Sequence, residues 1–345
     1  MKTGQTLSEI AAELEAQLKA KHDYVAPSSQ LVMDPKSNLT ITGKGSFELS
    51  ELAHDQLAGR SGIPSKYYQR MRESAPELLA QNVNHWFQKE PSKKMVRTIG
   101  RTARAILSDR YRPLDNFDLA ETALPLVKKM GCRVESSALT EHHLYLKLVT
   151  ERITAEVVGD VVQMGIVISN SEVGCGSVKV EPMIWTLRCK NGMVAPDYSM
   201  RKYHVGRAGV EGSLADEFFR DETRQADDKA FWMKVRDTIE GSMKQDVFDK
   251  IVAKLRAAGE DEVTGDPVKV VEVTQERFGL SDDERGSVLR HLIKDGGLTR
   301  YGLLNAITAS SQDSADYERA TQLERIGGDV LELPRRDWAA IAGAK

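Results

Sequence analysis

The chain has 345 residues, of which 41% are hydrophobic and 29% are charged, and its formal net charge is -3. A chain of this length and apolar content can bury a core without disulfides or bound metal. The near balance of charges excludes a polycation that coats nucleic acid or membrane with its whole surface, so any basic binding surface must be local.

The N-terminal part of the chain predicts helices. Thr6 and Glu9 have the spacing of a capping box in front of an amphipathic stretch. Ser50 is suited to cap a second helix, and Pro64 is suited to open a third. We therefore expect a helical N-terminal region over residues 1–75.

The middle of the chain predicts strands. Short runs rich in Val, Ile, Thr and aromatic residues begin near residue 82. They indicate strands at residues 83–88, 95–99, 102–107, 133–137, 144–150, 161–169 and 178–188. One helix interrupts them, with Asp115 or Asn116 as its cap and Gly131 after its end. We expect a β-rich core domain over residues 76–210, built as a curved antiparallel sheet with this helix packed on it.

Charged, helical sequence follows the predicted core. Apolar residues recur at helical intervals over a segment that we place at residues 211–260, and residues 259–265 have the composition of an acidic linker. A helical C-terminal region is expected over residues 261–345. The predicted fold class is α+β, with helical regions on both sides of the sheet.

Two features predict a cytoplasmic protein without a membrane segment. Residues 1–15 carry charges where a secretory signal requires an apolar stretch, and no later segment is long and apolar enough for a membrane span. Cys132, Cys175 and Cys189 are an odd number of cysteines at wide spacing, which is typical of a reducing compartment.

The sequence contains no recognisable catalytic constellation. The string at residues 43–46, Gly-Lys-Gly-Ser, lacks the upstream glycine of a phosphate-binding loop. The cysteines form no closely spaced pair, and the adjacent His142 and His143 would point to opposite faces of a strand. We therefore expect neither a cofactor nor a metal, and a protein that is not an enzyme. Cys175, between two glycines, is interpreted as part of a sharp turn, and a nucleophilic thiol is the alternative.

Residues 93–112 form a basic segment in an otherwise balanced chain. If they form a hairpin, cations project from a β ribbon with aromatic rings near them in sequence, which suits binding of unstacked single strands. The candidate phosphate-binding residues are Lys93, Lys94, Arg97, Arg101, Arg104, Arg110 and Arg112, and the candidate rings are Trp86 and Tyr111. A second cluster contains Arg201, Lys202, Tyr203 and Arg207.

Two other interpretations of these basic residues remain open. The cations can belong to a solvated sheet face on which nearby acidic residues pair with them. Residues 56–70 also have the helix, tight turn and helix pattern of a module that reads duplex DNA.

Several short motifs resemble a known family. They lie at residues 62–64, 96–98, 104–116, 169–171, 187–192 and 298–308. In them the chain resembles the phage/plasmid-like family that contains domain of unknown function 932, and the order of elements has a more distant likeness to single-strand annealing proteins of phage and eukaryotic recombination. The resemblance implies DNA metabolism of a mobile element.

The expected function follows from the basic segment and the resemblance together. It is binding of single-stranded DNA or RNA, with ATP-independent annealing in phage or plasmid recombination or repair, by a homo-oligomer that can form a ring. The alternatives are a protein-interaction or inhibitory factor of a mobile element, and an enzyme that uses Cys175.

Overall fold

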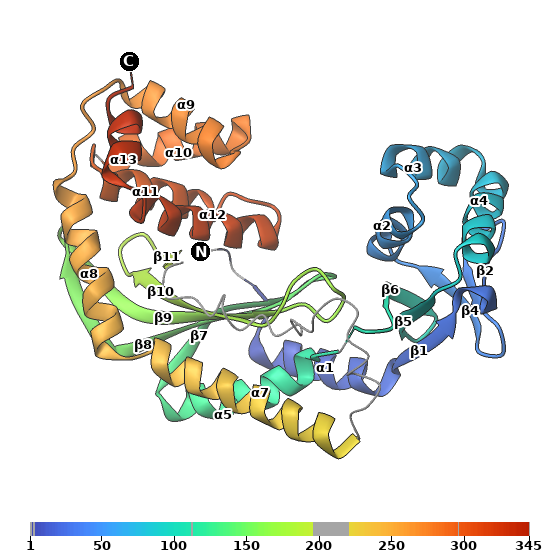
Figure 1. The fold of residues 1–345 in the computed structure, drawn as a ribbon. Coiled ribbons are helices and arrows are strands. Elements are labelled where there is room, and N and C mark those ends of the chain that lie inside the picture. Colours follow the sequence, from blue (N-terminus) through green and yellow to red (C-terminus); the bar gives the residue numbers. More distant parts are fainter. Residues whose placement is uncertain (1, 3, 112, 196–220, 296, 345) are drawn as a thin grey trace.

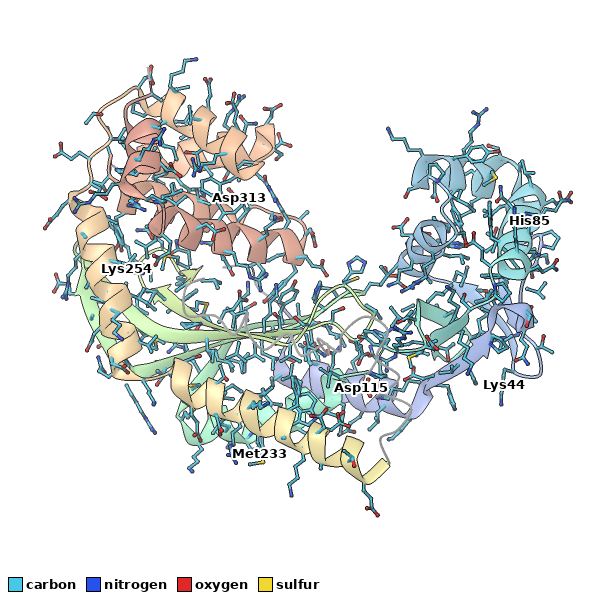
Figure 2. The ribbon with its side chains drawn as sticks, viewed as in Figure 1. Lys44, His85, Asp115, Met233, Lys254 and Asp313 are labelled. Carbon is cyan, nitrogen blue, oxygen red and sulfur yellow. The ribbon has the colours of Figure 1, made fainter. Side chains whose placement is uncertain are left out.

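The computed structural model describes the chain except for residues 1, 3, 112, 196–220, 296 and 345, and it has two lobes (Figure 1). The N-lobe comprises residues 21–111. The C-lobe comprises the described residues before 21 and after 112. Figure 2 places Asp115 where the lobes meet, whereas Lys44 and His85 lie on the far side of the N-lobe.

The N-lobe is a six-stranded sheet covered by three helices. Its strand order is β1-β5-β6-β4-β3-β2, and only the pair of β4 and β6 is parallel. The strands are β1 (Lys21–Pro27), β2 (Leu31–Met33), β3 (Leu39–Ile41), β4 (Gly45–Leu49), β5 (Lys93–Ile99) and β6 (Thr102–Ser108). The helices are α2 (Glu51–Arg60), α3 (Ser65–Ser74) and α4 (Pro76–Lys89). A separate apolar core, which includes the fully buried Leu57, Leu79 and Val96, joins these helices to the sheet.

The C-lobe is built on a five-stranded antiparallel meander in the order β11-β10-β9-β8-β7. The strands are β7 (Cys132–Leu139), β8 (Leu144–Val157), β9 (Asp160–Asn170), β10 (Lys179–Thr186) and β11 (Asn191–Val194). The pairing register shifts between Val134 and Ser136 and between Val149 and Thr154. Such irregularities bend a sheet, and the sheet is visibly curved (Figure 1).

Helices cover both faces of this curved sheet (Figure 1). One face carries α1 (Leu7–Ala20), α5 (Asn116–Lys129) and α7 (Asp221–Ser242). The other carries α11 (Arg300–Ser310) and α12 (Tyr317–Leu331), and α8 (Gln245–Glu260) crosses the end of the sheet. The outer helices are α9 (Pro267–Phe278), α10 (Asp282–Asp295) and α13 (Arg335–Ala342). Within the described residues, no helix is both long and apolar enough to cross a membrane.

The α+β fold with a curved antiparallel sheet and a packed helix is confirmed, and so is the capping box. The Thr6 side chain accepts from the Glu9 amide at 3.3 Å, and the Glu9 carboxylate accepts from the Thr6 amide at 2.7 Å. The predicted strands at residues 95–99, 102–107, 133–137, 161–169 and 178–188 coincide with β5, β6, β7, β9 and β10 to within two residues. The predicted strand at residues 144–150 is the first half of β8, which continues to Val157.

Three details of the sequence analysis are wrong. The predicted strand at residues 83–88 belongs to α4, because its apolar Val83, Trp86 and Phe87 follow a helical and not an alternating period. Residues 21–49, within the region expected to be helical, form four short strands. The hairpin of β5 and β6 belongs to the N-lobe sheet with these strands and not to the curved sheet.

Candidate nucleic-acid interface

The hairpin of β5 and β6 lies in the middle of the N-lobe sheet. Strand β5 pairs with β1 on its other side, and β6 pairs with β4. The hairpin turns at Gly100, whose φ of 56° suits glycine, and at the exposed Arg101. Because both strands have neighbours and helices cover the sheet, most side chains between the two ends of the hairpin are buried.

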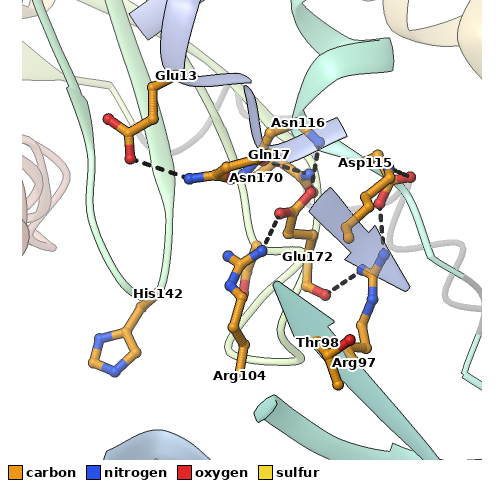
Figure 3. Close-up of polar contacts among 12 residues, drawn as sticks. Glu13, Gln17, Arg97, Thr98, Arg104, Asp115, Asn116, His142, Asn170 and Glu172 are labelled. Carbon is orange, nitrogen blue, oxygen red and sulfur yellow. Dashed lines mark hydrogen bonds and ion pairs between the residues drawn. The ribbon is translucent and has the colours of Figure 1, made fainter. Parts of the chain in front are cut away.

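Arg97 is buried and fully engaged (Figure 3). Its Nε donates to Asp23 Oδ1 at 2.8 Å, its Nη2 to Asp115 Oδ1 at 2.7 Å, and its Nη1 to the Glu172 carbonyl at 2.5 Å. Burial opposes the charge on Arg97, but Asp23 and Asp115 raise the pKa of its guanidinium above the ordinary value. The predicted role of Arg97 in binding phosphate conflicts with this placement, since its donors are occupied inside the protein.

Arg104 is engaged in the same way from the neighbouring strand. Its Nη1 donates to Glu172 Oε1 at 2.7 Å, and the other oxygen of this buried carboxylate accepts from the Asn116 amide at 3.0 Å. Lys21 pairs with Asp115 beside this group. These residues form a polar cluster that connects the two lobes, here called the interlobe junction: Asp23, Arg97, Arg104, Asp115 and Glu172. Figure 3 shows the last four of them.

The turn between β9 and β10 completes the interlobe junction. Gln56 of α2 donates to the Val173 carbonyl at 2.7 Å and accepts from the Ile106 amide at 2.7 Å. Asn170 donates to the Leu114 carbonyl at 2.7 Å. Three of the motifs that carry the family resemblance, at residues 96–98, 104–116 and 169–171, therefore meet here. Their shared place in the structure is a connection between lobes.

The two described candidate rings are partly covered. Trp86 lies on helix α4, its Nε1 donates to Asn82 at 3.0 Å, and the ammonium of Lys89 sits 5.5 Å from its ring centre. Tyr111 donates to the Ser171 carbonyl at 3.3 Å, and burial raises the pKa of its phenol to about 12. Neither ring is presented on an open sheet face, contrary to expectation.

The remaining described cations of the segment lie at the two ends of the hairpin. Lys93 and Lys94 begin β5, Arg110 follows β6, and Arg101 is at the tip. None of these four makes an ion pair within 4.0 Å with another described residue. Arg112 and the second cluster, Arg201, Lys202, Tyr203 and Arg207, lie outside the described residues.

Arg60 joins the open end of the hairpin, and the sequence analysis did not select it. It is the last residue of α2, and its Nε donates to the Ile106 carbonyl at 2.8 Å. Partial burial and the nearby Arg60 charge lower the pKa of Lys94, while Asp109 and Glu90 act in the opposite direction. We call Arg60, Lys93, Lys94 and Arg110 the open-end cluster. Helix α3 follows it along the chain and exposes Lys66, Tyr67 and Arg70.

Cys175 is exposed in the turn between β9 and β10, which is the sharp turn that the sequence predicts there. Its amide donates to Ser171 Oγ at 3.0 Å within the turn. Burial and the Glu318 charge raise the pKa of the thiol, which is opposite to the activation that a thiolate nucleophile needs.

His142 and His143 lie in the loop before β8 and not on a strand, and both approach one carboxylate. Their Nδ1 atoms are 3.4 and 3.2 Å from Glu318 Oε1. Although burial opposes it, His143 and Thr140 lower the pKa of Glu318 to about 2. No group of three or more metal-binding side chains occurs within the described part of the chain.

Comparisons of the chain with protein-family models, with curated proteins and with solved structures find no match. The resemblance to the phage/plasmid-like family and the likeness to annealing proteins therefore stay predictions.

Proposed function

We propose that the protein binds single-stranded nucleic acid through the open-end cluster, with Arg101 at the hairpin tip as a secondary contact. The observation that carries the proposal is the position of four cations at the open end of the hairpin, with no carboxylate partner within 4.0 Å among the described residues. Arg60 of α2 lies close to Lys94 of β5, Lys93 begins the same strand and points to the other face of the sheet, and Arg110 follows β6. Arg60 and Lys94 repel each other, and a phosphate backbone relieves this repulsion while it releases its counterions.

Single strands suit this site better than a specific duplex sequence. Tyr67 is 47% exposed at the start of α3, a few residues after Arg60, and an exposed ring can stack on any base. The cations supply contacts with phosphates, which position a strand but do not read its sequence. Annealing of complementary strands without ATP, by a homo-oligomer, is part of the proposal and rests on the resemblance described above.

The test compares two variants of equal net charge by fluorescence anisotropy with labelled oligonucleotides. The binding variant carries Lys93→Glu, Lys94→Glu and Arg110→Glu, all at exposed or half-exposed positions. The control carries Lys44→Glu, Lys128→Glu and Lys250→Glu, which are exposed on other elements. We expect the binding variant to lose about 100-fold or more in affinity at low salt. The slope of log affinity against log salt concentration should become shallower by about two units, because each of the three lost phosphate contacts contributes roughly 0.7. The control should keep most of the affinity.

Each other result has a defined meaning. Equal losses in the two variants would show that binding follows net charge and would reject the open-end cluster. A preference of the wild type for duplex would move the site to α2 and α3. Absence of binding by the wild type at low salt would reject the proposal and favour a protein-interaction factor. If single strands bind, mixing two labelled complementary strands and following energy transfer tests annealing directly.

A further inference from the structure

A small pocket lies at the end of the curved sheet that is farther from the N-lobe (Figure 1). It is formed by the β8–β9 turn, the β10–β11 turn, α10 and the first two turns of α11, and its volume is about 140 Å³. Its lining includes Val158, Asp160, Arg188, Leu292, Tyr301 and Asn305. None of these residues belongs to the open-end cluster, so the inference below is independent of the proposed function.

Asp160 has a buried carboxylate with one oxygen unsatisfied. Its side chain is 8% exposed. Oδ2 accepts a hydrogen bond from the Tyr301 hydroxyl at 3.3 Å, whereas Oδ1 is buried and accepts none from the described residues. A buried acceptor without a partner is costly, and a charged one more so. The pocket therefore contains an anionic acceptor that is suited to an N–H donor from outside the chain.

The other groups around the pocket define the rest of the ligand. The Arg188 guanidinium is 71% exposed, and its Nη1 lies 3.8 Å from Asp160 Oδ1, which is an ion pair but too long for a hydrogen bond. Burial raises the pKa of Tyr301, so its hydroxyl stays protonated as the donor to Asp160. Val158 and Leu292 supply an apolar wall.

We propose that this pocket binds a small zwitterion of the α-amino acid class. The ligand ammonium donates to Asp160 Oδ1, the ligand carboxylate pairs with Arg188, and a small apolar side chain contacts Val158 and Leu292. The close spacing of the two protein charges matches a ligand whose ammonium and carboxylate are bonded to the same carbon atom. A cavity of about 150 Å³ holds a molecule the size of benzene, so this pocket takes a ligand of about six to nine non-hydrogen atoms. In a nucleotide, by contrast, the base and the phosphate are separated by the sugar.

The test is isothermal titration calorimetry of the full chain with alanine, valine and leucine. For each we would also titrate the N-acetylated form, which lacks the ammonium, and the decarboxylated amine, which lacks the carboxylate. We expect one ligand per chain for at least one free amino acid and no binding of either derivative. Arg188→Ala is at an exposed position and should keep the fold, yet it should weaken binding by about tenfold or more, because a charged contact is lost. Arg236→Ala, on the exposed face of α7, is the matched control and should bind as the wild type does.

Two outcomes would overturn the proposal. One is the absence of heat from all three amino acids at 10 mM or about that concentration, which would mean that water alone fills the pocket. The other is binding of nucleoside monophosphates in place of amino acids, lost in Asp160→Asn, which would assign the pocket to a nucleobase. Circular dichroism spectra and melting temperatures of Asp160→Asn and Arg188→Ala establish that a loss of binding is not a loss of fold.

Discussion

The cations of one hairpin occupy two opposite environments. Arg97 and Arg104 point into the interlobe junction, where Asp23, Asp115 and Glu172 take up their donors. Lys93, Lys94, Arg101 and Arg110, on the same two strands or next to them, are at the ends of the hairpin and have no ion-pair partner among the described residues. The position along the strand, and not the residue type, separates the two sets.

The difference shows that a basic run in a sequence is not by itself a binding surface. The partners of Arg97 and Arg104 come from β1, from the N-terminus of α5 and from the β9–β10 turn, so these arginines connect segments that are distant along the chain. Only the cations left over after this pairing can neutralise phosphates. The tests of Arg97, Asp115 and Arg101 below separate a structural set, which stabilises the fold, from a surface set, which does not.

The largest loss in free energy of unfolding is expected from Arg97→Met. The substitution keeps a long side chain but leaves Asp23 and Asp115 without their guanidinium, and breaking a buried ion pair from one side costs about 3–5 kcal/mol. Urea unfolding, followed by tryptophan fluorescence and circular dichroism, measures the change in free energy of unfolding. A loss under about 1 kcal/mol would mean that the junction does not stabilise the connection between the lobes.

A smaller effect, with a dependence on pH, is expected from Asp115→Asn. Burial favours the neutral acid, but Arg97 and Lys21 hold the pKa of Asp115 below its ordinary value. The carboxylate therefore stabilises the fold fully above its unfolded pKa of about 4, and this contribution is lost as the pH falls through the lower folded pKa. Because the Asp115 side chain makes no capping bond to α5, the variant reports on the charge interactions alone.

At neutral pH we expect Asp115→Asn to cost about 1.5–3 kcal/mol, the usual contribution of hydrogen bonds to a charged group. The difference from the wild type should shrink as the pH falls from about 4 through the lower folded pKa, because the wild-type carboxylate becomes protonated first in the unfolded chain and then in the fold. Urea unfolding of both proteins at several pH values between about 2 and 7 measures this difference. A difference that does not change with pH would contradict the assigned ionic role of Asp115.

Local patterns in the sequence predicted the elements whose signals are local. The capping box at Thr6 and four of the five strands of the curved sheet, β7 to β10, were found because caps and apolar periods act over a few residues. Of the four missed strands at residues 21–49, β2 and β3 span only Leu31–Met33 and Leu39–Ile41. Three residues cannot display a period, and the pairing with neighbouring strands stabilises them instead.

The candidate site could be predicted only in part, because its decisive contacts are long-range. Arg97 and Asp23 are 74 positions apart, and Arg104 and Glu172 are 68 apart. Nothing in the local composition around Arg97 shows that it will meet an acid from β1. Arg60 was overlooked for the same reason, since only its contact with the Ile106 carbonyl brings it to the hairpin. Asp160 and Tyr301, which form the small pocket, are separated by 141 positions.

A substitution in the strained turn beside the small pocket should raise the free energy of unfolding by a modest amount, whereas the two substitutions above lower it. Val158 has a φ of 51°, in the left-handed region that a β-branched residue rarely adopts, and its side chain is 55% exposed. Asparagine tolerates this conformation, so Val158→Asn should stabilise the fold by about 1 kcal/mol, the usual scale of the left-handed penalty. The same urea titration measures the gain, and an unchanged or lower stability would show that the contact of Val158 with Gly259 outweighs the strain.

The smallest effect is expected from Arg101→Ala at the hairpin tip, and it completes the comparison within the hairpin. Arg101 is exposed and makes no ion pair with the described residues, so its removal should change the free energy of unfolding by less than about 0.5 kcal/mol. If the open-end cluster binds single strands, the same variant should weaken binding only slightly, as expected for one secondary phosphate contact. A large loss of stability would place Arg101 with Arg97 in the structural set. A large loss of affinity at unchanged stability would instead move the centre of the binding surface from the open end of the hairpin to its tip.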